Sequence, residues 1–139
     1  MNDAFVADAS VGIAWAVQSQ SSLETDRLLE DIEAARPFVV PALWALEVAN
    51  SLLMQKNRRR ITADEHLNAR QMLQGLAPEV DVEGSALALN RVSDLAESQS
   101  LTVYDAIYLE LAIRRGLPLA TRDGKLKHAA ARCHLKSLL

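Results

Sequence analysis

The sequence predicts an α/β protein in which a parallel β-sheet is sandwiched between α-helices. Short apolar runs of strand length alternate along the chain with longer stretches of helical periodicity. Such alternation favours parallel strands whose helical connections cover both faces of the sheet. A length of 139 residues suits one domain with a sizeable core, and no linker or repeat divides it. We therefore expect residues 1–139 to form a single domain.

The first half of the chain alternates between two predicted strands and four predicted helices. The strands are expected at 4–7 and 38–40, and the helices at 11–18, 21–32, 41–55 and 62–73. Ser21 and Glu24 stand at the spacing of a capping box, which predicts a helix start. Thr62 and Glu65 repeat that pattern. Pro41 is tolerated in the first turn of a helix and is expected to open the third one.

The second half of the chain adds strands at both of its ends. A weaker strand is expected at 79–82, a stronger one at 117–121, and a last edge strand at 135–139. Helices are expected at 85–97, 103–115 and 124–132. The apolar stripe of Leu87, Leu89, Val92 and Leu95 predicts a core-facing side of the first of these helices. Thr102 is expected to cap the second helix, and Gly116 to end it.

The cysteine count and the start of the chain indicate the cellular compartment. Cys133 is the only cysteine, so an intrachain disulfide is excluded, and a reducing compartment is predicted. The start of the chain lacks the basic residues of a secretory signal, and the apolar stretch 11–17 is too short to span a membrane. We therefore expect a cytoplasmic protein without a membrane partner. The three histidines, His66, His128 and His134, are dispersed and are expected on the surface.

Four acidic side chains occupy positions that suit a metal site. Asp8 and Asp123 each follow a predicted strand, Asp105 lies in the first turn of a predicted helix, and Glu47 lies inside an apolar helix. Carboxyl ends of parallel strands form the ligand-binding edge of such sheets. A carboxylate beside buried backbone is costly unless something pairs with it, and a divalent cation pairs with several at once. These residues predict a site for Mg²⁺ or Mn²⁺.

Three of these acids also have purely structural interpretations. Asp123 can cap the last helix, because aspartate is a preferred residue at that position. Asp105 can be the third residue of a capping box that begins at Thr102. Asp8 can be a turn residue, with Ser10 starting the next helix. None of these roles excludes metal binding.

Glu47 is harder to explain by structure alone. The helix around it is so apolar that we expect it to be buried on most sides, where a glutamate needs a partner. The alternative is a surface stripe formed by Glu47, Asn50 and Ser51. The sequence leaves both interpretations open.

The contexts of the four acids resemble those of the PIN-domain ribonucleases, and most closely the small VapC-type toxins of bacterial toxin–antitoxin pairs. The matching strings are Ala7-Asp8-Ala9-Ser10, Leu46-Glu47-Val48-Ala49-Asn50, Tyr104-Asp105-Ala106 and Leu119-Ala120-Thr121-Arg122-Asp123. The resemblance implies a PIN-like fold and an endoribonuclease that binds Mg²⁺ or Mn²⁺ through the four acids. It also implies an RNA substrate, neutralisation by a cognate antitoxin, and a homodimer.

Each site residue has an expected role in that chemistry. Metal ions that activate water and bridge phosphoryl oxygens need carboxylate ligands. Asp8 and Asp105 are expected as direct ligands, and Asp123 as a ligand of a second ion or an outer group. Glu47 is expected to hold a metal-bound water or to act as base. The side chains expected to orient these carboxylates are Ser10, Asn50 and Thr121.

Two other functions remain open at this stage. A receiver-like phosphoacceptor domain also has acids at the sheet edge. Such a domain would require a lysine at the end of a strand near the C-terminus, and it would have no use for Glu47 inside a helix. A non-catalytic protein-binding module would use the acids only as caps. Metal binding separates this module from an enzyme. The basic run Lys56–Arg60 either contacts RNA phosphates or is a solvated connection between helices.

Overall fold

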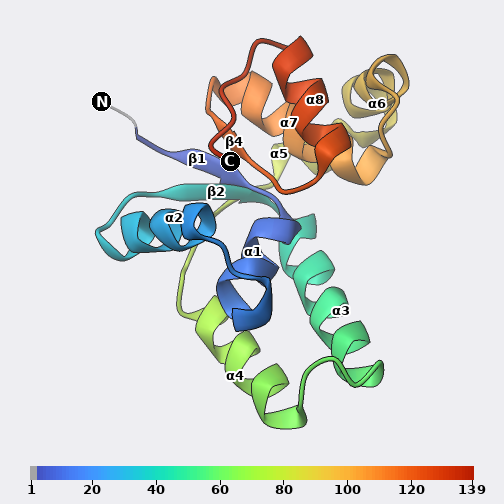
Figure 1. Cartoon of the computed structure of the whole chain (residues 1–139). Helices are drawn as coiled ribbons and strands as arrows, with labels where there is room; N and C mark the ends of the chain where they lie inside the picture. The colour runs from blue at the N-terminus through green and yellow to red at the C-terminus, as the bar shows by residue number, and fades with distance from the viewer. Residues whose placement is uncertain (1–2) are drawn as a thin grey trace.

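A parallel sheet forms the centre of the molecule in the computed structural model, which describes residues 3–139 (Figure 1). Its strands are β1 (Phe5–Ala7), β2 (Phe38–Pro41), β3 (Glu79–Asp81) and β4 (Leu119–Ala120). They lie in the order β3-β2-β1-β4, and every pairing is parallel. The predicted α/β class is thereby confirmed.

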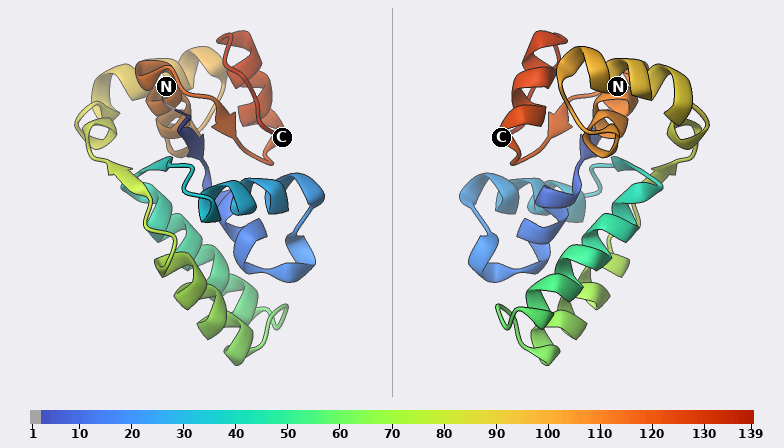
Figure 2. Two further views of the ribbon diagram at one scale, coloured as in Figure 1. Left: turned by 90° about the vertical axis from the view of Figure 1, so that its left-hand side faces the viewer. Right: turned by 90° about the vertical axis from the view of Figure 1, so that its right-hand side faces the viewer.

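Helices cover both faces of this sheet. They are α1 (Ala9–Ala16), the 3₁₀ turn η1 (Gln18–Gln20), α2 (Leu23–Glu33), α3 (Leu43–Asn57), α4 (Ala63–Gln74), α5 (Glu83–Ala86), the π-type segment η2 (Ala88–Val92), α6 (Ser93–Gln99), α7 (Val103–Arg115) and α8 (Gly124–Arg132). Helices α1–α4 lie on one side and α5–α8 on the other, and α3 and α4 project as a long hairpin (Figure 2). No helix within residues 3–139 is long and apolar enough to cross a membrane.

The strands are apolar because both faces of the sheet are covered. Every residue of β1, β2 and β4 is buried. Four aromatic rings pack together beside β1 and β2, in edge-on and stacked contacts, and they belong to Phe5, Trp15, Phe38 and Trp44. Both tryptophans are therefore core residues, at 7% and 4% exposure.

The helix starts follow the sequence with small shifts. The capping box of Thr62 and Glu65 forms as predicted. The predicted box at Ser21 is wrong by one residue, because Ser22 has the extended backbone of a cap and exchanges hydrogen bonds with Thr25. Pro41 does not open α3. It ends β2, opposite Asp81 of β3, and the helix begins two residues later.

Two ends of other elements also differ from the prediction. The first helix is α1, which runs from residue 9 to 16 rather than from 11 to 18, because Asp8 caps it directly after β1. The predicted edge strand 135–139 is wrong, since only an isolated bridge joins Ser137 to Leu119 of β4. Gly116 ends α7 as predicted, with the left-handed φ of +63° that favours glycine.

The predicted helix 85–97 is wrong as a continuous element. It divides into α5, η2 and α6, and the amide of Val92 donates to the carbonyl of Leu87 five residues back at 3.0 Å. The wider π turn rotates the apolar face. Val92 is buried as predicted, whereas Leu89, also predicted in the core, is 96% exposed.

Two expectations about burial on the α3–α4 hairpin are also wrong. Helix α3 is not buried on most sides, because it packs on α1 and α4 mainly through the side that carries Val48 and Leu52. Leu46 is 70% exposed and Leu53 is 43% exposed. His66, expected on the surface, is only 9% exposed because it lies on the buried side of α4.

Gly12 allows α1 and α3 to approach closely. A Cβ atom at this position would lie 2.8 Å from Cζ2 of Trp44 and 3.2 Å from Cγ2 of Val48. Trp44 is held in place, because its indole Nε1 donates to the carbonyl oxygen of Asp8 at 3.1 Å. The contact therefore sets the distance between the helix that follows β1 and the helix that carries Glu47.

We expect Gly12→Ala to lower the free energy of unfolding by about 1–3 kcal/mol, because overpacking the core exceeds the gain of about 1 kcal/mol in helix propensity. Gly124→Ala is the matched control, since a Cβ there meets no atom within 4 Å. Urea denaturation of both variants measures the difference. Equal stability of the two variants would contradict a tight contact between α1 and α3.

Candidate functional site

Two of the four acids leave neighbouring strands at the same edge of the sheet. Strands β1 and β4 pair in parallel, with Ala7 opposite Ala120. Asp8 follows β1 directly, and its amide donates to the carbonyl of Ala120 at 3.1 Å. Asp123 follows β4 after two residues. The carboxyl edge predicted from the sequence therefore exists, and it carries these two aspartates.

Asp8 is the most enclosed of the acids, at 5% exposure. Its Oδ1 accepts hydrogen bonds from Ser10 Oγ at 2.6 Å and from the Val11 amide at 3.2 Å, which caps α1. Its Oδ2 accepts from Thr121 Oγ1. Burial nevertheless raises the pKa of Asp8, and the charge of Asp105 adds to this effect, although the three hydrogen bonds oppose it.

Ser10 and Thr121 link Asp8 to the loop that follows β4. Ser10 Oγ accepts from the Arg122 amide at 2.9 Å, and Thr121 Oγ1 accepts from the Asp123 amide at 3.0 Å. Asp123 itself caps α8, because its Oδ2 accepts from the backbone amide three residues later at 3.0 Å. The structural role considered for Asp123 is therefore present, and its amide is tied to the hydroxyl that orients Asp8.

Glu47 has a partner that the sequence analysis missed. Tyr108 Oη donates to Glu47 Oε1 at 2.6 Å, and the tyrosine is 1% exposed. Burial raises the pKa of Glu47, the charges of Asp105 and Asp8 add to this, and the tyrosine hydrogen bond opposes it. The available signal was the position of Tyr108 one helical turn after Asp105, because a buried phenol usually finds a hydrogen-bond partner.

Asp105 interacts electrostatically with each of the other three acids. Its amide donates to Thr102 Oγ1 at 3.1 Å, so Thr102 caps α7 as predicted. Burial raises the pKa of Asp105, and the charge of Asp123 raises it further, while Thr102 and the charge of Lys125 oppose the shift. Since Asp105 in turn raises the pKa of Asp8 and of Glu47, the fold places all four acids in one electrostatic field.

The acids do not form a ready-made cage. Within residues 3–139, no three His, Cys, Asp or Glu side chains are arranged so that they could hold one metal ion together. Asn50 is exposed on α3, and its side chain makes no hydrogen bond to the four acids. The expectations that the four carboxylates share metal and that Asn50 orients one of them therefore stay predictions.

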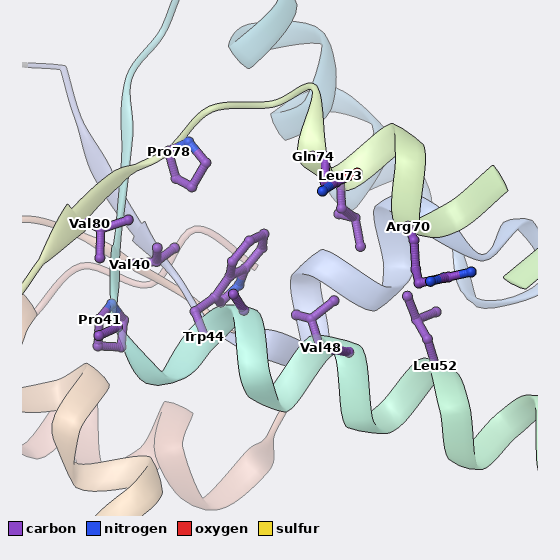
Figure 3. Close-up of a pocket in the computed structure, with 13 residues that line it drawn as sticks. Val40, Pro41, Trp44, Val48, Leu52, Arg70, Leu73, Gln74, Pro78 and Val80 are labelled. Carbon is purple, nitrogen blue, oxygen red and sulfur yellow. The ribbon is translucent and has the colours of Figure 1, made fainter. Parts of the chain in front are cut away.

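A groove that none of the four acids lines is formed between α3, α4 and β3 (Figure 3). It encloses about 390 Å³. Trp44 points into it from α3, opposite Pro78 and Val80. Arg70 is the charged side chain of its lining, and none of the four acids lines it. Its mostly apolar lining holds no carboxylate or imidazole that could serve as an acid, a base or a metal ligand.

Comparisons with known proteins identify the family. A family model described as PIN domain matches residues 5–132. The chain belongs to the PIN domain family. The resemblance drawn from the sequence is thereby confirmed.

Two known proteins, one compared by sequence and one by structure, show how far the similarity extends. The chain is 32% identical over 121 residues to Ribonuclease VapC3 from Pyrobaculum aerophilum. The aligned residues cover 87% of this chain and 90% of the relative. The crystal structure of PAE2754 from Pyrobaculum aerophilum superimposes with a TM-score of 0.72 and 20% identity. That comparison covers 99% of this chain and 85% of the solved one, and it supports the PIN fold.

We expect Asp8→Asn to become progressively more stable relative to the wild type as pH rises above the ordinary aspartate pKa of 3.8. The folded pKa of Asp8 is raised, so the folded protein binds its proton more tightly than the unfolded chain does, and the wild type loses stability as that proton leaves. Below pH 3.8 the side chain at position 8 is neutral in the wild type and in Asp8→Asn. The difference in stability between the two proteins should therefore be smallest there. Thermal unfolding across this pH range, without divalent ions, measures the effect.

Asp81→Asn is the control of opposite sign. Burial opposes ionisation of Asp81, but hydrogen bonds from Arg114 and the Gly84 amide, together with the charges of Arg114 and Arg115, lower its pKa overall. A lowered pKa contributes stability above pH 3.8 that is lost as pH falls. The Asp81 variant should therefore be less stable than wild type at neutral pH. If both variants shift in the same direction, a raised pKa of Asp8 in the folded protein is refuted.

Proposed function

We propose that this protein is a metal-dependent endoribonuclease that hydrolyses RNA phosphodiester bonds at the site of Asp8, Glu47, Asp105 and Asp123. One observation carries the proposal: the fold gathers four acids at one edge of the sheet, although burial and mutual repulsion raise the pKa of three of them. Such a cluster is costly for stability alone and is typical of functional sites. The similarity to a relative named as a ribonuclease supports the same activity.

The donor set fits a hard divalent cation. Carboxylate oxygens are the ligands that Mg²⁺ and Mn²⁺ prefer, and Mg²⁺ usually binds one or two carboxylates while keeping several waters. A site in which Asp8 and Asp105 hold the ion, with Asp123 in the outer shell, meets this requirement without a cage of three side chains. When bound, the ion lowers the pKa of a water and neutralises charge on the phosphate.

The protein's own residues orient the reacting groups. Ser10 and Thr121 fix the carboxylate of Asp8, because each donates to a different oxygen. Tyr108 occupies Oε1 of Glu47 and leaves Oε2 for a water. Burial raises the pKa of Glu47, which makes it a better proton acceptor near neutral pH than an ordinary glutamate. We assign Glu47 to bind the attacking water and to accept its proton.

We also propose that the chain acts as a VapC-type toxin. Residues 1–139 would form one cytoplasmic domain, active as a homodimer and neutralised by a cognate antitoxin. The name of the similar relative supports this reading. The acids also suit inhibition, because an arginine or lysine of a partner could pair with them and displace the metal. The side of α3 beyond Trp44, lined with apolar residues, would supply the nonpolar part of such a contact.

We expect Asp105→Asn to reduce cleavage of RNA in Mg²⁺ or Mn²⁺ by at least ~100-fold, since it removes a positioned charge from the site. Folding should survive, because the substitution relieves repulsion from Asp123. Mn²⁺ should raise the thermal midpoint of the wild type and have a smaller effect on the variant. Gel assays of a structured RNA and thermal shift measurements check both effects.

Asp94→Asn is the matched control, because Asp94 is an exposed acid on α6 and its loss changes net charge equally. Cleavage by Asp105→Asn at the rate of this control would remove Asp105 from the mechanism. A wild type that neither cleaves RNA nor responds to Mn²⁺ would favour the binding module instead. Metal-dependent phosphorylation of Asp8 without RNA cleavage would favour the receiver-like alternative.

We expect expression of the chain alone to arrest bacterial growth, and Asp8→Asn to abolish the arrest without loss of folded protein, because the carboxylate is a proposed metal ligand. Co-expression of a small antitoxin encoded beside it should also restore growth. Growth curves with matched protein levels measure this. A harmless wild type at high levels of folded protein would argue against a toxin, even if the protein cleaves RNA in vitro.

A further inference from the structure

A polar hollow adjoins the acidic site. It encloses about 320 Å³ and is lined by Ser10, Ile13, Gln20, Ser51 and Arg122. Ser10 forms a shared wall, because its hydroxyl donates to Asp8 at 2.6 Å. Ser51 extends the wall along α3, one helical turn beyond Glu47. The hollow therefore shares Ser10 with the hydrogen-bond network that orients Asp8.

The walls of this hollow are joined by a chain of hydrogen bonds. Gln20 Nε2 donates to Gln55 Oε1 at 2.7 Å, and Gln55 Nε2 donates to Ser51 Oγ at 3.4 Å. Gln55 is only 8% exposed, so this chain is part of the packed structure. Arg122 Nη1 donates to the carbonyl oxygen of Gln20. The guanidinium is thus held by η1, which is itself anchored to α3.

Arg122 places a positive charge at this hollow, and it also borders a neighbouring hollow that Glu24 and Lys127 line. Across residues 3–139, Arg122 forms no ion pair, and no carboxylate lines the hollow. Its hydrogen bond to Gln20 uses one edge of the guanidinium and leaves other N–H groups available. A guanidinium with a nearby serine hydroxyl matches the oxygens and the charge of a phosphate group.

The neighbouring acids explain why a nuclease would need such a cation. Asp8, Glu47 and Asp105 create a negative field that repels an RNA backbone. A metal ion offsets this repulsion only at the phosphate that it contacts. The adjacent phosphate of the same strand needs a separate cation, and Arg122 lies in the loop after β4, between Thr121 and Asp123 in the sequence.

We propose that this hollow is a phosphate subsite, which binds the RNA phosphate next to the one that is cut. Arg122 is its principal ligand, and the Ser51 hydroxyl is a second donor. Binding there places the strand so that the next phosphate lies over the acids. The inference rests on the proposed ribonuclease activity and adds to it a binding group outside the four acids.

A neutral linkage in the substrate provides the sharpest test. The substrate is an RNA oligonucleotide that the protein cuts at one junction, prepared in three forms: all-phosphate, and with a methylphosphonate at the linkage on either side of the cut. We expect one of the two neutral linkages to raise the wild-type KM by about 10-fold, with little change in kcat, because it removes one charge-assisted contact.

The variant Arg122→Gln should show the same rise in KM on the all-phosphate substrate, and no further rise with the sensitive neutral linkage. Arg122→Lys keeps the charge and should recover part of the affinity. Arg91→Gln is the matched control, because Arg91 is exposed on η2, does not line the hollow, and also forms no ion pair within residues 3–139. Its KM should stay at the wild-type value. Circular dichroism melts check that Arg122→Gln remains folded.

Several outcomes would overturn the subsite. If the neutral linkage and Arg122→Gln reduce affinity independently, Arg122 only ties the loop to η1. If Arg91→Gln raises KM equally, net charge alone is responsible. If Arg122→Gln cleaves every substrate like wild type but loses affinity for the antitoxin, the hollow binds an acidic protein segment. A wild type that cleaves no RNA refutes the ribonuclease proposal itself, and is distinguished from the other outcomes because they all retain activity.

Discussion

The burial of one carboxylate, that of Asp8 at the end of β1, constrains the structure around it. At 5% exposure this group needs hydrogen-bond donors from its surroundings, and it obtains them from Ser10, the Val11 amide and Thr121. Those donors come from the first turn of α1 and from the end of β4. The pairing of β1 with β4 and the start of α1 are therefore tied to the same side chain.

Helix α7 performs the corresponding task on the other side of the site. Its first turn carries Asp105, and Tyr108 reaches Glu47 across the core from the next turn. Its last turn carries Arg114, which pairs with Asp81 at 2.7 Å and with Glu110 at 2.9 Å, and both of these acids are buried. The ion pairs attach α7 to the edge strand β3, so the helix that positions the site is anchored at its far end.

Polar and apolar side chains are concentrated on different parts of the surface. Acids and hydroxyls gather where β1 and β4 end, with the polar hollow of Arg122 alongside. The apolar groove lies beyond Trp44, on the side of α3 that faces α4 and β3. Trp44 belongs to both regions, since its ring lines the groove while its indole nitrogen donates to the backbone of Asp8. The groove and the backbone of Asp8 are thus in contact with the same side chain.

Much of this protein is determined by local sequence. The alternation of apolar strands and periodic helices specifies the α/β class, because each pattern reflects burial of one segment's own side chains. The capping pair Thr62 and Glu65 and the stop at Gly116 also depend on neighbours within a few residues. The four acids could be singled out for the same reason, since each stands in an apolar context that its immediate neighbours define.

Only the tertiary structure decided which side chains meet. The bond from Tyr108 to Glu47 spans 61 residues, and the bond from Thr121 to Asp8 spans 113. The exposure of Leu89 follows from a π turn, and the burial of His66 from the packing of α4. The hydrophobic periodicity of a helix indicates which of its residues face the core, but it does not indicate which side chains from other elements they contact. Partners across the core depend on how the helices pack on the sheet, and that packing is a property of the whole chain.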